Sequence, residues 1–272
     1  MESACALICL MHGINSVYHD LSNDFWGEFK GFSPIPYKFI YLTFHCNFIH
    51  MVFGLVWLLE IYVPGSVPMV HTIVHFVAGL GFFVGFNYYV LIHFDRNLRE
   101  EVKKTALIGD LVLYGREISP PVFWRVMNWV HAPLIPMSGL FLVTMDRTTT
   151  AAAIADASTT WMLVCGYGLF YACIVQLIFR WHACWVYPFM AKFTHSWQHI
   201  AFYTFSFGFM GLLSLSYRDI IFRDPKYDLL GVGIELDMVV RLSVGLLVLL
   251  TTAGLLVATE EEEEKEEIKK TR

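Results

Sequence analysis

The chain has 272 residues, of which 56% are hydrophobic and only 16% are charged, and its mean hydropathy is +0.53. Soluble domains carry about 25% charged residues, so this composition excludes an ordinary soluble enzyme. The aromatic content of 16% is also far above that of a disordered or nucleic-acid-binding chain. The net charge of −5 is small, and much of it comes from the glutamate-rich tail. We therefore expect a polytopic membrane protein with no nucleic-acid partner.

Apolar segments long enough to cross a bilayer core of about 30 Å, which needs about 20 helical residues, recur along the chain. They cover residues 3–19, 39–59, 69–94, 126–145, 157–179, 193–217 and 242–259. Pro64 and Pro68 predict a short turn before the third of these segments. We expect an all-α bundle of six or seven transmembrane helices over 1–259, followed by a charged tail at 260–272.

The first segment, 3–19, is short and contains His12 and His19. A signal peptide is the alternative interpretation. The segment has neither a basic N-terminal region nor a small-residue cleavage pattern, which favours a retained helix.

The basic residues predict the orientation of the bundle. Fourteen Lys and Arg residues fall on the face that includes the 95–125 loop and the tail, and four fall on the other face. Because cytosolic loops carry the excess of basic residues, the C-terminus is predicted to lie in the cytosol. The terminal Lys269-Lys270-Thr271-Arg272 resembles the dilysine retrieval signal of endoplasmic reticulum membrane proteins. The endoplasmic reticulum is thus the expected location, with the cell membrane as a second one.

Histidine is the residue type that indicates chemistry, since the chain has eleven and several lie inside predicted spans, where polar groups are costly. No G-x-S-x-G, P-loop or G-x-G-x-x-G motif occurs. The pairs His71/His75 and His195/His199 have the i,i+4 spacing that a metal could use, and a haem between His75 and His199 is one such arrangement. Hydrogen bonding of these side chains to neighbouring helices is the simpler interpretation, because the adjacent His-His boxes of membrane di-iron enzymes are absent.

A second pair is Thr43 with His131. Thr43 lies five residues after Lys38, and His131 lies six residues after Arg125, so the two side chains lie about 7.5 and 9 Å below the same membrane face. A threonine hydroxyl can act as a nucleophile when an imidazole accepts its proton. Pro133 and Pro136 would kink the helix beyond His131 and free backbone carbonyls. A threonine bonded to its own helix and a packing histidine are the alternatives that the residues alone leave open.

Four motifs resemble the androgen-induced membrane protein family over roughly residues 5–217. They are YKFIYLTF at 37–44, HFDR at 93–96, HAPLIP at 131–136 and WVYPF at 185–189, in the family's order. The last predicted span, about 240–259, lies beyond this family-like core.

The resemblance implies an integral membrane hydrolase of lipid esters that acts on fatty acid esters of hydroxy fatty acids and needs no cofactor. It implies Thr43 as the catalytic nucleophile and His131 as the catalytic base. Asp95, Arg96, Trp185, Tyr187 and Pro188 match family motifs but receive no role. The alternatives are a histidine-liganded redox protein that binds haem or metal, and a non-enzymatic membrane regulator.

Overall fold

The computed structural model describes residues 2–22, 37–93, 112–113, 116–117, 120–145, 147–182 and 185–222. Nearly all of this is helix, as the apolar segments predict. In chain order the elements are α1 (Glu2–Ser22), the 3₁₀ turn η2 (Tyr37–Ile40), α2 (Leu42–Tyr62), α3 (Met69–Asn87), the π-helical η3 (Tyr88–His93), the two-residue strands β1 (Val112–Leu113) and β2 (Arg116–Glu117), α5 (Pro120–His131), α6 (Leu134–Thr144), α7 (Arg147–Ala153), α8 (Ala157–His182), the 3₁₀ turn η4 (Pro188–Lys192) and α9 (Ser196–Phe222).

Four helices of the described residues are long and apolar enough to cross a membrane. They are Leu42–Tyr62, Met69–Val90, Ala157–Trp181 and Ser196–Asp219. Each coincides with a predicted span, and the predicted turn before the second is present, with Gly65 at a φ of 83°. The predicted segment 3–19 is helical but does not meet both criteria, and the predicted span 126–145 is divided between α5 and α6. The predicted segment 242–259 and the tail lie outside the described residues.

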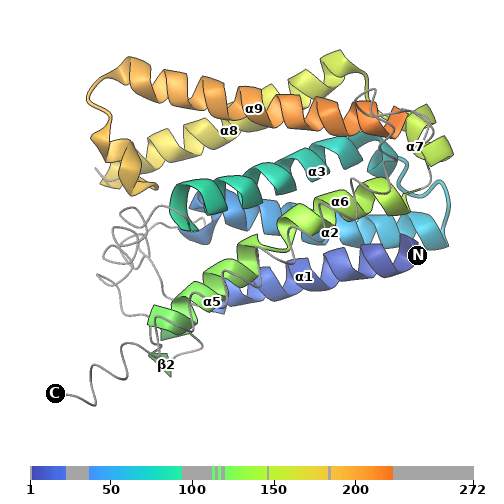
Figure 1. The fold of residues 1–272 in the computed structure, drawn as a ribbon, viewed down its shortest axis with the longest axis horizontal. Helices are drawn as coiled ribbons and strands as arrows, with labels where there is room; N and C mark the ends of the chain where they lie inside the picture. Colours follow the sequence, from blue (N-terminus) through green and yellow to red (C-terminus); the bar gives the residue numbers. More distant parts are fainter. Residues whose placement is uncertain are drawn as a thin grey trace, which may run out of the picture.

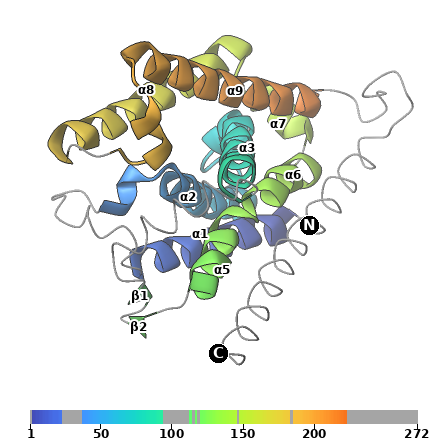
Figure 2. The ribbon, with the colours of Figure 1, turned by 60° about the vertical axis from the view of Figure 1, so that its left-hand side comes forward.

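Helix α3 lies at the centre of the bundle (Figures 1 and 2). It packs against α2, α6 and α9, while α1 covers α2, and α8 pairs with α9 along one side. Glycines allow these close contacts: a Cβ on Gly79 would lie 2.9 Å from the Cα of Ser214 in α9, and a Cβ on Gly81 would lie 2.8 Å from the His50 ring in α2. Small residues at helix crossings are typical of packing in membranes, where the dispersion contacts between close backbones hold helices together.

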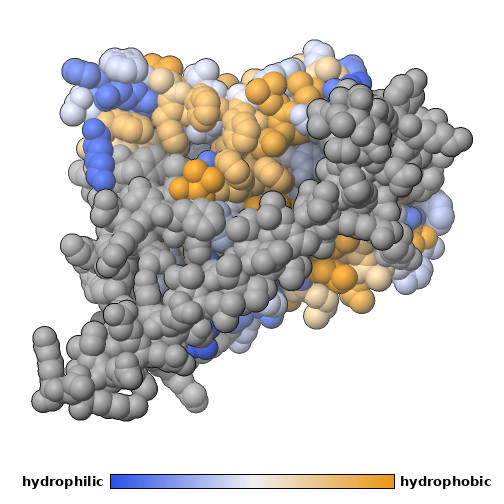
Figure 3. All heavy atoms as spheres, viewed as in Figure 1, coloured by the Kyte–Doolittle hydropathy of each residue, from blue (hydrophilic) through white to orange (hydrophobic). Residues whose placement is uncertain are grey.

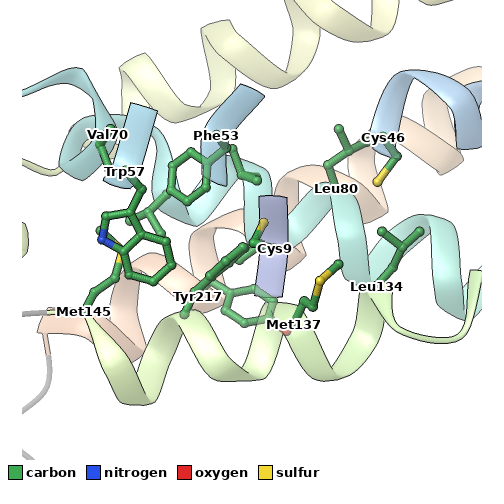
Figure 4. Packing of buried hydrophobic residues seen from close by; sticks show 14 of the residues in the cluster. Cys9, Cys46, Phe53, Trp57, Val70, Leu80, Leu134, Met137, Met145 and Tyr217 are labelled. Atoms are coloured by element: carbon green, nitrogen blue, oxygen red, sulfur yellow. The ribbon is translucent and has the colours of Figure 1, made fainter. Parts of the chain in front are cut away.

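The main core contains side chains from α1, α2, α3, α6 and α9 (Figure 4). Trp57 and Phe53 of α2 both meet the Phe141 ring of α6 edge-on, with ring centroids 5.6 and 5.3 Å apart. Cys9 and Cys46 are fully buried free thiols in the same cluster. They pack as small hydrophobic groups, as their positions in apolar segments predict.

The outer surfaces of α8 and α9 are apolar. Phe205, Leu169 and Ile200 are 75%, 67% and 65% exposed. Hydrophobic residues also run across this region of the surface in Figure 3. Large exposed apolar faces on long helices are expected where lipid is the solvent.

Candidate active site

Thr43 and His131 are joined by a hydrogen bond. Thr43 is the second residue of α2, and His131 is the last residue of α5. The Thr43 Oγ1 atom lies 2.8 Å from His131 Nε2, although 88 residues separate them in the chain. The equal depth predicted by counting residues is therefore realised as direct contact between the two side chains.

The other ring nitrogen determines the direction of this hydrogen bond. His131 Nδ1 lies 2.6 Å from the carbonyl oxygen of Met127, one helical turn earlier. A carbonyl only accepts, so Nδ1 carries the proton and the neutral ring presents the Nε2 lone pair to Thr43. The Thr43 hydroxyl is the donor, which is the arrangement that a general base requires.

The His131 ring is also held by its neighbours. It stacks on Tyr88, the first residue of η3, with ring centroids 3.9 Å apart and planes inclined by 14°. The Tyr88 hydroxyl donates to Asn128 Oδ1 at 2.9 Å, which ties this ring back to α5. Gly85 permits the approach, because a Cβ there would lie 3.2 Å from the His131 carbonyl oxygen. Tyr88, Asn128 and Met127 were not predicted from the sequence, in which the only signal for them is a polar residue, Asn128, inside an apolar segment.

The break between α5 and α6 occurs directly after His131, at Ala132 and Pro133. Pro133 has no N–H, so the carbonyl of Trp129 loses its helical donor. His12 Nε2 of α1 forms a hydrogen bond with that carbonyl at 3.2 Å, and Asn47 Nδ2 of α2 donates to the carbonyl of Val130 at 3.2 Å. The predicted kink is confirmed, and two side chains from neighbouring helices satisfy the backbone oxygens beside it.

The hydrogen-bonded pair opens into a cavity of about 110 Å³ between α2, α3, α8, η4 and α9. Its walls are mainly apolar and aromatic, and its lining includes Leu42, Phe83, Val84, Tyr88, Tyr171, Val175, Tyr187, Met190, Phe202, Tyr203 and Phe207. Asn87 and Ser206 add polar groups. A site of this composition suits an apolar ligand with one polar group placed at the threonine.

The WVYPF segment borders the same cavity. Trp185 stacks between Phe179 of α8 and His199 of α9, with centroid distances of 3.9 and 4.4 Å, and so fixes the connection between the two helices. Tyr187 lines the cavity, and Pro188 begins η4. Asp95 and Arg96, the other motif residues, lie outside the described residues.

A buried charge lies near this end of the bundle. Lys38 of η2 is 3% exposed, five residues before Thr43. Burial raises the pKa of Asp20, at the end of α1, to about 7, and the positive charge of Lys38 opposes that rise. The pair couples the start of α2 electrostatically to α1.

The two HxxxH pairs do not converge on one site. His71 Nδ1 lies 3.0 Å from Thr150 Oγ1, and His75 Nε2 lies 2.8 Å from Thr160 Oγ1. His75 is near the C-terminal end of α9, since its neighbour Gly79 contacts Ser214, whereas His199 is in the first turn of α9. A haem held by His75 and His199 therefore has no geometric basis. Among the described residues, no three His, Cys, Asp or Glu side chains form a metal-binding group.

A family model described as "FAR-17a/AIG1-like protein" matches residues 2–219. No curated protein and no solved structure matches the chain. The match covers most of the chain, including all four motifs and both residues of the hydrogen-bonded pair. The chain therefore belongs to the FAR-17a/AIG1-like family, the androgen-induced protein family that its motifs resemble.

Proposed function

We propose that this protein is an integral membrane hydrolase of lipid esters in which Thr43 is the nucleophile and His131 is the general base. The observation that carries the proposal is the 2.8 Å hydrogen bond from Thr43 to the Nε2 atom of His131, whose Nδ1 proton is committed to Met127. A nucleophile, a base and a group that orients the base are the three parts that covalent catalysis requires. Here the orienting group is a backbone carbonyl.

The reaction has two steps. Thr43 Oγ1 attacks the ester carbonyl while His131 Nε2 accepts its proton, and the protonated ring then gives that proton to the departing alkoxide, which leaves an acyl-threonine. A water molecule, deprotonated by the same ring, then attacks the acyl group, releases the fatty acid and restores the threonine. The oxyanion forms near the first turn of α2, where the Thr43 and Phe44 N–H groups have no intrahelical acceptor.

The apolar lining of the cavity supports a substrate with hydrocarbon chains. Phe83, Val84 and Phe207 lie in the walls beyond the reacting pair. Each methylene that leaves water contributes about 0.8 kcal/mol, which concentrates long-chain esters in the apolar phase where this cavity lies, so long-chain esters should be hydrolysed in preference to short-chain esters. Together with the family resemblance, this favours fatty acid esters of hydroxy fatty acids, drawn from the membrane in which the protein lies.

The test is hydrolysis of such an ester by the purified protein in detergent. Thr43→Ala should reduce the rate at least about 1,000-fold while the protein still accumulates in the membrane. Thr43→Ser keeps the hydroxyl and should retain part of the activity. A folded Thr43→Ala protein with full activity would contradict the proposal, and a wild-type protein without activity would favour a regulatory role instead.

We further propose that the protein resides in the endoplasmic reticulum with its C-terminus in the cytosol. The distribution of basic residues and the terminal Lys269-Lys270-Thr271-Arg272 support this. Protease added to sealed microsomes should then remove a C-terminal tag. A tag that stays protected until detergent is added would show that the C-terminus lies on the opposite side of the membrane.

A further inference from the structure

Tyr187 lies beside the nucleophile and lines the cavity, but its hydroxyl is engaged with the protein backbone. The backbone N–H of Leu42, the first residue of α2, donates to Tyr187 Oη at 3.3 Å. Tyr187 Oη also lies 2.8 Å from Tyr171 Oη, and the Tyr171 hydroxyl donates to the carbonyl of Ile40 at 2.9 Å. These contacts connect the WVYPF segment, α8 and the start of α2.

The donors and acceptors in this chain of hydrogen bonds can be assigned. A tyrosine hydroxyl has one proton, and that of Tyr171 is given to the Ile40 carbonyl, which can only accept. The proton between the two phenols must therefore come from Tyr187. Tyr187 thus accepts from Leu42 and donates to Tyr171, so its hydroxyl has no proton left for an oxyanion in the cavity.

We propose that Tyr187, supported by Tyr171, is a positioning residue that fixes the first turn of α2 and thereby holds the Thr43 hydroxyl against His131. This role rests on the proposed function. The two phenols hold the backbone on both sides of Tyr41, at the Ile40 carbonyl and at the Leu42 N–H. The proposed role explains the presence of Tyr187 in the WVYPF motif, although Tyr187 takes no part in the reaction itself.

The start of α2 needs such support from outside the helix. The first N–H groups of a helix have no intrahelical acceptor, and the residue before α2, Tyr41, makes no side-chain capping bond. Thr43 is the next residue after the one that Tyr187 holds, so a shift of the helix start moves the nucleophile directly. Displacing a reacting group by about 1 Å can cost about 100-fold in rate.

The experiment compares Tyr187→Phe, Tyr171→Phe and the double variant with Tyr167→Phe, using long-chain ester hydrolysis by purified protein and the thermal midpoint of each variant. Tyr167 is the matched control. Like Tyr171 it lies on α8, and its hydroxyl contacts α2, but this contact is with the His45 ring at 3.3 Å, and Tyr167 does not line the cavity. Tyr187→Phe should lower kcat about 10- to 100-fold and leave KM within about twofold, since the lost contact orients the nucleophile and does not bind substrate.

Tyr171→Phe should lower kcat less, because Tyr187 can still accept from Leu42. The double variant should match Tyr187→Phe within about twofold, because the two hydroxyls act as one unit. Tyr167→Phe should keep the wild-type kcat.

Three results would overturn this role: a wild-type kcat in Tyr187→Phe, a raised KM with unchanged kcat, or purely additive effects in the double variant. If Tyr187→Phe does not fold, Tyr171→Phe decides, and a wild-type kcat in that variant refutes the proposal. If the wild-type protein hydrolyses no ester, the proposed function is refuted, and the positioning role of Tyr187 is refuted with it.

Discussion

Two threonine–histidine hydrogen bonds, Thr43–His131 and Thr160–His75, differ in the direction of the proton. Thr160 Oγ1 donates to the Asp156 carbonyl at 2.8 Å, so in the pair with His75 the imidazole must be the donor. In the Thr43–His131 pair the imidazole is the acceptor, because its Nδ1 proton is held by Met127. Only an accepting imidazole can remove a hydroxyl proton, so residue type and distance alone do not identify the base.

This difference predicts opposite results for two histidine substitutions. His131→Ala should reduce turnover by about 100-fold or more, as is typical when a general base is removed. His75→Ala should leave turnover per folded molecule unchanged and lower the unfolding free energy by about 2–5 kcal/mol, since it removes a buried hydrogen bond and leaves a cavity where a fully buried ring was. Steady-state hydrolysis and chemical denaturation measure the two effects. Equal loss of turnover in both variants would contradict the assignment.

At the residue level, the sequence predicts the pair but not its orientation. Counting residues from Lys38 and Arg125 places Thr43 and His131 at one depth because helices have a fixed rise. The hydrogen bond to the Met127 carbonyl depends on the rotamer of His131, and the stacking of the Tyr88 ring depends on tertiary packing. No sequence pattern encodes either contact.

At the level of elements, the sequence predicts the α5–α6 break, because it follows from Pro133. The sequence does not predict which side chains of other helices hydrogen-bond to the carbonyls beside the break. His12 lies in the short first predicted segment, and in the structure its Nε2 atom contacts the carbonyl of Trp129. Helices α1 and α2 also cross closely: a Cβ on Gly54 would lie 2.6 Å from the backbone N of Leu10, and a Cβ on Gly13 would lie 2.6 Å from Met51. Such contacts between helices far apart in sequence cannot be read from hydropathy.

The α1–α2 crossing predicts that Gly54→Ala destabilises the protein by about 1–3 kcal/mol, because the added methyl group meets backbone atoms that cannot move aside alone. Gly166→Ala in α8 is the matched control, since a Cβ there meets nothing within 4 Å. That change should be neutral or stabilising by up to about 1 kcal/mol through helix propensity. Thermal midpoints of both variants in one detergent provide the comparison. A Gly54→Ala protein as stable as Gly166→Ala would show that α1 does not pack this tightly.

For the molecule as a whole, hydropathy predicts where the four long helices lie. Their alternating direction explains why the motif segments at 37–44, 131–136 and 185–189 gather. One cavity is lined by residues from the N-terminus of α2, the end of α3, the second half of α8 and the first half of α9. These residues are spread along the chain from position 42 to position 207. The helices lie side by side with α3 central (Figure 2), and the close contacts at glycines that accompany this order cannot be read from the sequence.

The site of covalent labelling shows whether Thr43 forms the covalent bond to the substrate. A fluorophosphonate should react with Thr43 Oγ1, with loss of fluoride, and peptide mass spectrometry should find the phosphonyl mass on Thr43. The label should be absent from Thr43→Ala and strongly reduced in His131→Ala, because the hydroxyl then lacks its base. A phosphonyl group on another residue, with Thr43 unmodified and the ester still hydrolysed, would show that Thr43 is not the nucleophile.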